Sequence, residues 1–292
     1  MAINILSFDI EEWYLETKLH GGRKFKLRQY DDCFAQLLDE LDRQGIRATF
    51  FCVGQLAKEF PQVVREIAAR GHEVGCHSNE HSWLDKMSVG ELRADTSDAI
   101  HALEDVVGQK VRSYRAPAFS ITRHNKWAVE VLAECGIEHD SSIFPAARDF
   151  GGFPSFPSNE PCKITVNGIT VKEFPIAMAS ICGKKLAYSG GGYFRMLPYP
   201  FIKNTMSKND YNICYFHLND LIRQKIAMKS RKEYEEYFGE PGTLKNRVLR
   251  YVKSNIGNGD GYGKLLRLMH DFEFVAIRDA EVDWDGAKEI VL

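Results

Sequence analysis

Short apolar runs alternate with amphipathic segments along the first half of the chain, and this pattern predicts alternating strands and helices. The apolar runs occupy residues 3–9, 47–54, 72–77 and 111–117, and another comes late, at residues 211–220. Each of the first four is followed by a segment with apolar residues at helical spacing. Repeated strand–helix units predict parallel strands joined by right-handed crossovers, in an open sheet or a closed barrel.

Residues typical of helix ends support these boundaries. Ser88 and Glu91 have the spacing of a capping box at the start of a helix. Pro61 suits a first helical turn, and Gly71 suits the C-terminal cap of the same helix. Helices are therefore predicted between successive strands.

The alternation breaks in the middle of the chain. Residues 144–161 contain four prolines and are predicted to be a loop. The Asn-Gly pair at 167–168, between two Ile-Thr-Val runs, predicts a two-residue hairpin turn. The glycine-rich segment 189–200 has neither the lysine nor the spacing of a phosphate-binding loop. We interpret residues 144–195 as a hairpin and loop excursion within a single domain that covers residues 1–292.

The last part of the chain is predicted to be mainly helical. Helical spacing recurs near residues 244–255 and 263–270, and residues 272–277 have the apolar pattern of a last strand. The stretch 223–239 is first basic and then acidic, which indicates a solvated helix.

The composition is that of an ordinary globular protein of 292 residues, 44% of them hydrophobic and 27% charged. A formal net charge of −2 gives no electrostatic reason to expect nucleic acid or an anionic membrane as a partner. No apolar run approaches the roughly 20 residues of a membrane span, and the first residues lack the features of a secretory signal. We therefore expect a cytoplasmic protein. Its seven cysteines, without paired spacing, are expected to be reduced thiols.

Charged and imidazole side chains gather at the ends of the predicted strands. They are Asp9, Glu11 and Glu12 after the first strand, His77 and His81 after the third, Arg115 in the fourth, and His217 and Asp220 in the late strand. The C-terminal ends of parallel strands meet at one edge of such folds. We therefore expect these groups to converge.

His77 and His81 are four residues apart, so their imidazoles can face a common point on a helix or around a tight turn. With one carboxylate they would form a site with room for water, which is the geometry of catalytic zinc and related divalent metals. Zn²⁺ is the favoured ion, with Co²⁺, Ni²⁺ and Mn²⁺ as alternatives.

Five ordered motifs carry a resemblance to a known family. They are Asp-Ile-Glu-Glu at 9–12, Ala-Thr-Phe-Phe at 48–51, Gly-His-Glu-Val-Gly-Cys-His at 71–77 continuing to His81, Arg-Ala-Pro-Ala-Phe at 115–119, and Tyr-Phe-His at 215–217. Over residues 3–220 the chain resembles the NodB-homology polysaccharide deacetylases, carbohydrate esterase family four. Segments 140–145 and 190–195 resemble the branch found near bacterial exopolysaccharide-synthesis genes. The resemblance implies a distorted seven-stranded (β/α) barrel.

The resemblance also implies roles for individual residues. Asp9 would be the general base, His77 and His81 metal ligands, Arg115 the group that orients the base, and His217 the general acid. Four further residues are candidates for substrate contact: Glu12, Phe119, Asp140 and Tyr193.

The chain departs from the family pattern in two places. Most relatives have two adjacent aspartates, a base and a metal ligand, but Ile10 occupies the second position here. Because strand side chains alternate between faces, Glu11 can project with Asp9, so we predict Glu11 as the third ligand, with Glu12 as the alternative. The family's aspartate–tryptophan pair that supports the acid is also absent, and either Asp140 or Asp220 is expected to replace it.

These observations predict a metal-dependent deacetylase acting on an N-acetylated amino sugar in a glycan or glycan precursor. A metal ion would activate water and polarise the amide carbonyl, while a base and an acid move the protons. The alternatives are another C–N hydrolase, such as a sugar deformylase or a ureide or imide hydrolase, and a non-catalytic glycan-binding barrel.

Overall fold

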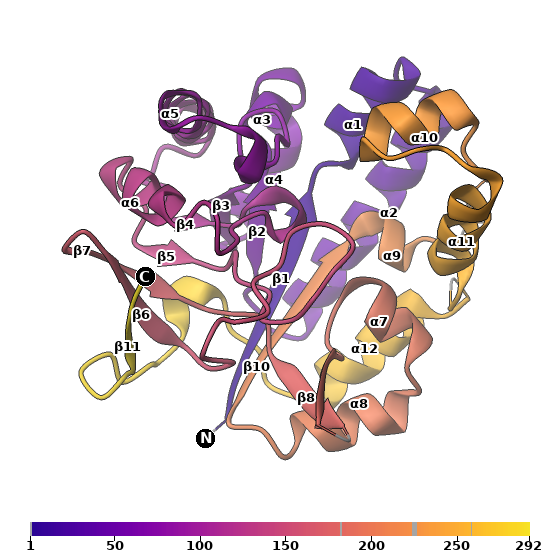
Figure 1. The fold of residues 1–292 in the computed structure, drawn as a ribbon. Helices are drawn as coiled ribbons and strands as arrows, with labels where there is room; N and C mark the ends of the chain where they lie inside the picture. The colour runs from indigo at the N-terminus through magenta and orange to yellow at the C-terminus, as the bar shows by residue number, and fades with distance from the viewer. Residues whose placement is uncertain (1, 182, 224–226, 258) are drawn as a thin grey trace.

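A nine-stranded sheet forms the centre of the fold, with its strands in the order β10-β1-β2-β3-β4-β5-β7-β6-β11 (Figure 1). The computed structural model describes residues 2–181, 183–223, 227–257 and 259–292. The strands of the sheet are β1 (Ile3–Ile10), β2 (Thr49–Cys52), β3 (Glu73–Cys76), β4 (Ser113–Tyr114), β5 (His139–Asp140), β6 (Cys162–Val166), β7 (Ile169–Glu173), β10 (Tyr211–His217) and β11 (Glu289–Val291). A separate hairpin pairs β8 (Met178–Ile181) with β9 (Lys184–Ala187).

The seven strands from β10 to β7 pair in parallel, whereas β6 is antiparallel to β7 and β11 is parallel to β6. A hydrogen bond links the start of β10 to the chain just after β7. In it, the Tyr211 hydroxyl donates to the carbonyl oxygen of Pro175 at 2.9 Å. The predicted α/β class, with a mostly parallel central sheet, is confirmed.

Helices surround this sheet and connect its strands (Figure 1). They are α1 (Glu12–His20), α2 (Lys24–Arg43), α3 (Gly54–Glu59), α4 (Pro61–Ala69), α5 (Val89–Val107), α6 (Trp127–Glu134), α7 (Gly191–Met196), α8 (Tyr199–Met206), α9 (Leu218–Leu221), α10 (Arg231–Phe238), α11 (Leu244–Asn255) and α12 (Gly261–Asp271), with short 3₁₀ turns η1 (Leu84–Lys86), η2 (Pro117–Phe119) and η3 (Ile277–Asp279). The predicted capping box starts α5, since Ser88 and Glu91 exchange side-chain to backbone hydrogen bonds.

Aromatic residues fill the interior beneath the strand ends. The ring of Phe8 on β1 stacks against Phe50 on β2 at 5.0 Å and lies 6.0 Å from Phe216 on β10. All three side chains are fully buried. This packing fixes three neighbouring strands, and their C-terminal ends carry the charged residues.

The hairpin at Asn167–Gly168 is confirmed, but this part of the segment 144–195 belongs to the central sheet and does not leave it. It joins β6 to β7, and β7 pairs in parallel with β5, so the hairpin extends the central sheet. The expected last strand at 272–277 is also not formed. There, Val275 makes a single bridge to Ile5, and the chain then turns into η3.

The helices expected at 244–255 and 263–270 are α11 and α12. Within the stretch 223–239, residues 224–226 lie outside the described residues, and Arg231–Phe238 forms α10. No helix in the described part of the chain has both the length and the apolar character needed to cross a bilayer. The six described cysteines are free thiols, and Cys182 is not among the described residues.

Two buried carboxyl groups face each other where β5 pairs with β7. Asp140 and Glu173 are register partners, and their exposed fractions are 1% and 0%. The Ser142 hydroxyl donates to Asp140, and the backbone N–H of Ile143 donates to Glu173 at 3.1 Å. Burial raises the pKa of both carboxyls, and the neighbouring Asp140 raises the pKa of Glu173 further.

The contribution of this pair to the free energy of unfolding should consequently fall as the pH rises from about 4 through neutrality. Over that range the folded protein retains protons that the unfolded chain has released, and each contributes up to about 1.4 kcal/mol per pH unit. Glu173→Gln should flatten this dependence, whereas the control Glu138→Gln, at an exposed carboxylate, should not. Urea unfolding at several pH values measures the slope, and an unchanged slope in Glu173→Gln would contradict the prediction.

Candidate active site

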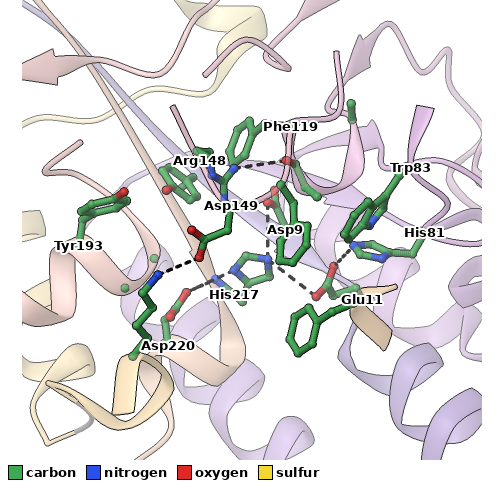
Figure 2. A pocket seen from close by; sticks show the side chains of 18 of the residues that line it. Asp9, Glu11, His81, Trp83, Phe119, Arg148, Asp149, Tyr193, His217 and Asp220 are labelled. Atoms are coloured by element: carbon green, nitrogen blue, oxygen red, sulfur yellow. Dashed lines mark hydrogen bonds and ion pairs between the residues drawn. The ribbon is translucent and has the colours of Figure 1, made fainter. Parts of the chain in front are cut away.

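A cavity of about 700 Å³ opens where the predicted strand-end residues converge (Figure 2). Its walls include Asp9, Glu11, His77, His81 and His217, which come from the ends of β1, β3 and β10 and from the loop after β3. Parallel pairing of the strands brings these distant parts of the sequence to one rim.

The pairing of β1 with β10 sets the position of two of these side chains. Asp9 is the register partner of His217, and both lie at the ends of their strands. Ile10 turns into the core and is fully buried, so Asp9 and Glu11 both reach the cavity.

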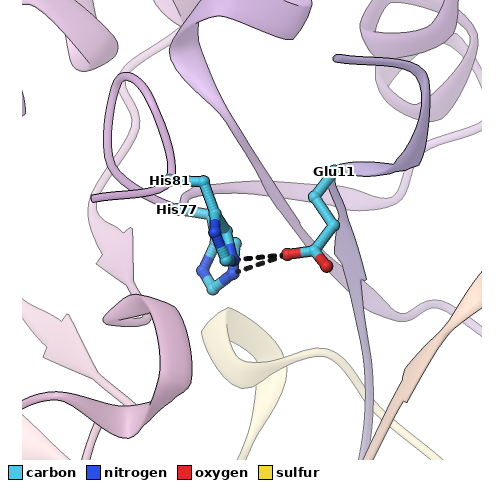
Figure 3. Close-up of side chains that lie close together, drawn as sticks. All are labelled: Glu11, His77 and His81. Atoms are coloured by element: carbon cyan, nitrogen blue, oxygen red, sulfur yellow. Dashed lines mark ion pairs between the residues drawn. The ribbon is translucent and has the colours of Figure 1, made fainter. Parts of the chain in front are cut away.

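Glu11, His77 and His81 all line this cavity and lie close together (Figure 3). One ligand atom from each residue lies within 4.8 Å of the others. Oε2 of Glu11 is 2.6 Å from Nε2 of His81 and 3.6 Å from Nε2 of His77. Ser78 and His81 have positive φ angles of 61° and 59°, so a tight turn, and not a helix, brings the imidazoles together.

The donor set fits a divalent cation. Nδ1 of His77 lies 2.7 Å from the carbonyl oxygen of Arg115, so Nδ1 donates and Nε2 keeps its lone pair toward Glu11. Oε2 of Glu11 is buried, and its close polar neighbours are the Nε2 atoms of the two imidazoles, as expected for a ligand atom. Burial opposes ionisation of Glu11, but His81 and the other nearby imidazoles outweigh it and hold its pKa well below the usual range. Two imidazoles and one carboxylate suit zinc and related metals.

Arg115 forms a fully buried ion pair with Asp9. Nη1 of Arg115 donates to Oδ1 of Asp9 at 2.8 Å and to the Ser7 hydroxyl at 3.0 Å. Its Nη2 donates to the Ser141 hydroxyl at 2.9 Å, and its guanidinium lies 4.2 Å from the Phe51 ring centroid. Burial would raise the pKa of Asp9, but the charges of Arg115 and of nearby histidines lower it below its usual value. Arg115 thus fixes both the rotamer and the charge of Asp9.

One ring nitrogen of His217 lies near Asp9 and Glu11, and the other contacts a third acid, Asp220. Its Nε2 lies 3.8 Å from both Asp9 and Glu11, while its Nδ1 lies 3.3 Å from Oδ2 of Asp220. Oδ1 of Asp220 in turn pairs with Nε of Arg195 at 3.1 Å. Burial would lower the pKa of His217, but the charges of Glu11, Asp220 and Asp9 raise it well above its usual value.

Two predicted residues do not reach the cavity. Asp140 is buried beside Glu173, so the partner of His217 is Asp220 and the expectation of Asp140 as that partner or as a substrate contact is wrong. Glu12 is 2% exposed and accepts from the backbone N–H of Asn219 at 3.0 Å. Burial and the charge of Glu11 raise its pKa to about 7.

Two neutral variants test whether Glu11 or Glu12 is the third metal ligand. Glu11→Gln should weaken Zn²⁺ binding by at least about 10- to 100-fold, because even residues that only support metal ligands have effects of that size. Glu12→Gln should retain the metal, since Glu12 lies outside the group formed with the two histidines. Titration against a competing chelator measures both affinities. Loss of metal only in Glu12→Gln would reverse the assignment.

The remaining candidates and several unpredicted residues line the cavity (Figure 2). Phe119 and Tyr193 are on its wall, and their contact with substrate stays a prediction. The residues that sequence reasoning missed come from the loop after β5, from α10 and from α11; they are Arg148, Asp149, Phe150, Phe238, Arg250 and Lys253. No spacing in the sequence marks them, because only tertiary packing brings these segments to the strand ends.

Two family models match the chain. Residues 27–139 match the polysaccharide deacetylase model, and residues 141–281 match a domain of unknown function, DUF3473. The chain is 33% identical to a peptidoglycan-N-acetylglucosamine deacetylase of Bacillus cereus over 32% of this chain and 35% of that protein. It is 34% identical to a chitooligosaccharide deacetylase of Azorhizobium caulinodans over 29% of this chain and 38% of that protein. The chain thus matches little more than a third of the length of these relatives.

Solved structures show the same fold. A Mycobacterium smegmatis protein described as a polysaccharide deacetylase aligns over 92% of this chain and 91% of its own, with 19% identity and a TM-score of 0.55. A CE4 family pseudoenzyme from Bacillus anthracis aligns over 99% of this chain and 69% of its own, with 12% identity and a TM-score of 0.50. The family match shows that residues 27–139 carry a polysaccharide deacetylase domain, the domain of the NodB-homology family, carbohydrate esterase family four, and the solved structures share its fold.

Proposed function

We propose that this protein is a metal-dependent hydrolase that removes the N-acetyl group from an amino sugar in a glycan or glycan precursor. The observation that carries the proposal is the meeting of three groups in one cavity. These are the two histidines with Glu11, the Asp9–Arg115 ion pair, and His217 with Asp220. The curated relatives that match the chain are named for deacetylation of N-acetylated amino sugars, which supports the same reaction.

Glu11, His77 and His81 would hold the metal ion, with Zn²⁺ favoured over Co²⁺, Ni²⁺ and Mn²⁺. When bound, the ion supplies Lewis acidity, which makes a water easier to deprotonate and an amide carbonyl easier to attack. His77 is kept in the tautomer that presents Nε2 by its contact with the Arg115 carbonyl.

Asp9 would accept the proton of the attacking water. Its Oδ1 is occupied by Arg115, so Oδ2, which faces His217, is the oxygen available for the transfer. Because Arg115 is fully buried and bonded on several sides, the carboxylate is held in one orientation before substrate arrives.

His217 would donate a proton to the departing nitrogen from Nε2. Its Nδ1 is engaged by Asp220, which fixes the ring, and the Arg195 guanidinium anchors Asp220. The raised pKa of His217 keeps the imidazole protonated near neutrality, as the role of general acid requires.

The two family segments would work as one catalytic unit. Residues 141–281 supply β6, β7 and β10 to the sheet, and they also supply His217 and Asp220 to the cavity. This supports the single domain predicted for residues 1–292. A cytoplasmic location and a role in exopolysaccharide synthesis remain predictions from the sequence, and fractionation of the producing bacterium would test the location.

An acetate-release screen on N-acetylated chitooligosaccharides, peptidoglycan fragments and nucleotide-linked amino sugars tests the proposal. We expect acetate, but not formate, to be released, with activity lost on chelation and restored by added Zn²⁺. Formate release would favour a deformylase. Stoichiometric glycan binding without metal or product would favour the non-catalytic barrel.

A further inference from the structure

The charges on the cavity wall are unevenly distributed. Asp9, Glu11 and Asp220 surround the histidines, whereas Arg148, Arg250 and Lys253 line another part of the wall. Asp149 is the single carboxylate among the lining residues of that second part, which we call the cationic wall. Its three cations and one carboxylate give a formal net charge of +2. The proposed chemistry uses none of these residues.

Arg148 carries the argument because it has no ion-pair partner. Its Nη1 makes a 3.3 Å hydrogen bond to the carbonyl oxygen of Ala118, and no carboxylate of the described residues lies within 4.0 Å of it. The guanidinium lies over the rings of Phe119 and Phe144, at 4.8 and 4.6 Å. Phe119 is also 5.8 Å from the Arg115 guanidinium, so only one ring separates Arg148 from the ion pair with Asp9.

The loop that carries Arg148 is held closely against the turn that carries Phe119. The N–H of Gly152 donates to the carbonyl oxygen of Phe119 at 2.9 Å. Gly151 has a φ of +61°, and a Cβ at this position would clash with the carbonyl of Ala118. Arg148 is therefore placed at the cavity by backbone packing as well as by its own stacking.

The other two cations of the wall are held by aromatic rings and by a carboxylate. Phe150 and Phe238 stack at 5.4 Å with an interplanar angle of 11°, and the Arg250 guanidinium lies 5.1 Å from the Phe150 centroid and 4.5 Å from that of Phe238. Lys253 and Arg250 share Oδ2 of Asp149, at 2.8 and 3.4 Å. One carboxylate thus balances two cations, and a positive excess remains beside Arg148.

A positive excess in a partly desolvated cavity favours an anionic ligand. A guanidinium that rests on aromatic rings keeps its N–H donors in a fork that matches phosphate and carboxylate oxygens. A neutral glycan would be recognised through hydroxyl and amide groups and gains nothing from excess positive charge. Simple packing of Arg148 on the two rings would also explain its position, so a test must separate binding from packing.

We propose that the cationic wall binds an anionic group of the substrate, a phosphate or a carboxylate, close to the N-acetyl sugar that is hydrolysed. This inference rests on the proposed function and specifies its substrate class. The substrate would be a glycosyl phosphate or a glycan that contains a uronic acid.

Direct binding and turnover with three probes test the inference. The probes are N-acetylglucosamine 1-phosphate, a disaccharide of N-acetylglucosamine and glucuronic acid, and neutral N,N'-diacetylchitobiose. We expect calorimetry to show at least about 10-fold tighter binding of one anionic probe than of the neutral one, as a charge-assisted hydrogen bond implies. The preferred probe distinguishes phosphate from carboxylate.

Arg148→Gln should lower the ratio of anionic to neutral affinity by about 10- to 100-fold, and Arg148→Lys should lower it less. Arg93→Gln, at an exposed arginine of α5 paired with Glu134, is the matched control for loss of one charge and should keep the ratio. Arg250→Gln provides a second variant if Arg148→Gln melts at a much lower temperature than the parent.

Equal binding of anionic and neutral probes, or an equal loss of both in Arg148→Gln, would overturn the inference. So would the same change of ratio in Arg93→Gln. Failure here is distinguishable from failure of the proposed function. Tight anion binding without acetate release would support anion binding by the cationic wall and refute the proposed hydrolase activity. Efficient acetate release from the neutral probe alone would support the hydrolase activity and refute anion binding by the cationic wall.

Discussion

Replacement of His77 by alanine is expected to abolish metal binding and acetate release together. His77 is 2% exposed, and its Nε2 faces Oε2 of Glu11 while its Nδ1 is fixed by the Arg115 carbonyl. Removing one of three ligands leaves a site that cannot hold the ion tightly. Without the Lewis acid, turnover should fall by at least about 10³-fold. Metal content by mass spectrometry and acetate release, measured on the same preparation, check both effects.

His101→Ala is the matched control for this experiment, because His101 is an exposed histidine on α5 and does not line the cavity. It should retain both metal and turnover. If His77→Ala bound one equivalent of metal with unchanged affinity, the ion would be held elsewhere and the assignment of the Glu11, His77 and His81 group would fail.

The part of the site that the sequence predicts best is its local geometry. Alternation at the end of β1 places Asp9 in the cavity and Ile10 in the core, and Glu11, the next residue, returns to the cavity side. Such neighbouring positions require no knowledge of the rest of the fold. Likewise, the four-residue spacing of His77 and His81 is enough to bring their rings to one point. Convergence of the strand ends then follows from parallel pairing.

What the sequence could not predict depends on long-range packing. The Asn-Gly turn identifies the hairpin of β6 and β7, but nothing local shows that β7 pairs with β5. The sequence also left open whether Asp140 or Asp220 supports His217, because that choice again depends on packing. Asp220 lies in the first turn of α9, three residues after His217, whereas Asp140 lies on β5, whose neighbour in the sheet presents Glu173. Arg148 and α11 reach the cavity only through such contacts.

The clustering of acids at the end of β1 has a physical explanation in the structure. Asp9 is neutralised by the fully buried Arg115, whereas Glu11 lies beside two imidazoles with which it would share a metal ion. Glu12 has no such partner, and its pKa is raised to about 7, so it is partly protonated near neutrality. Three adjacent acids are therefore tolerated because each is placed in a different environment.

Asp9→Asn is expected to keep the metal and lose turnover by about 10²- to 10⁴-fold, the range typical of a general base. Asparagine has the same shape and can still accept from Arg115 through its oxygen, but it cannot take a proton from water. The buried Arg115 then loses its counter-charge, which costs about 3–5 kcal/mol of stability, so activity must be measured well below the melting temperature.

Asp31→Asn, at an exposed carboxylate that accepts from the Trp13 indole outside the cavity, is the control. Loss of metal together with turnover in Asp9→Asn would make Asp9 a ligand, because a base that does not touch the ion can be removed without releasing it.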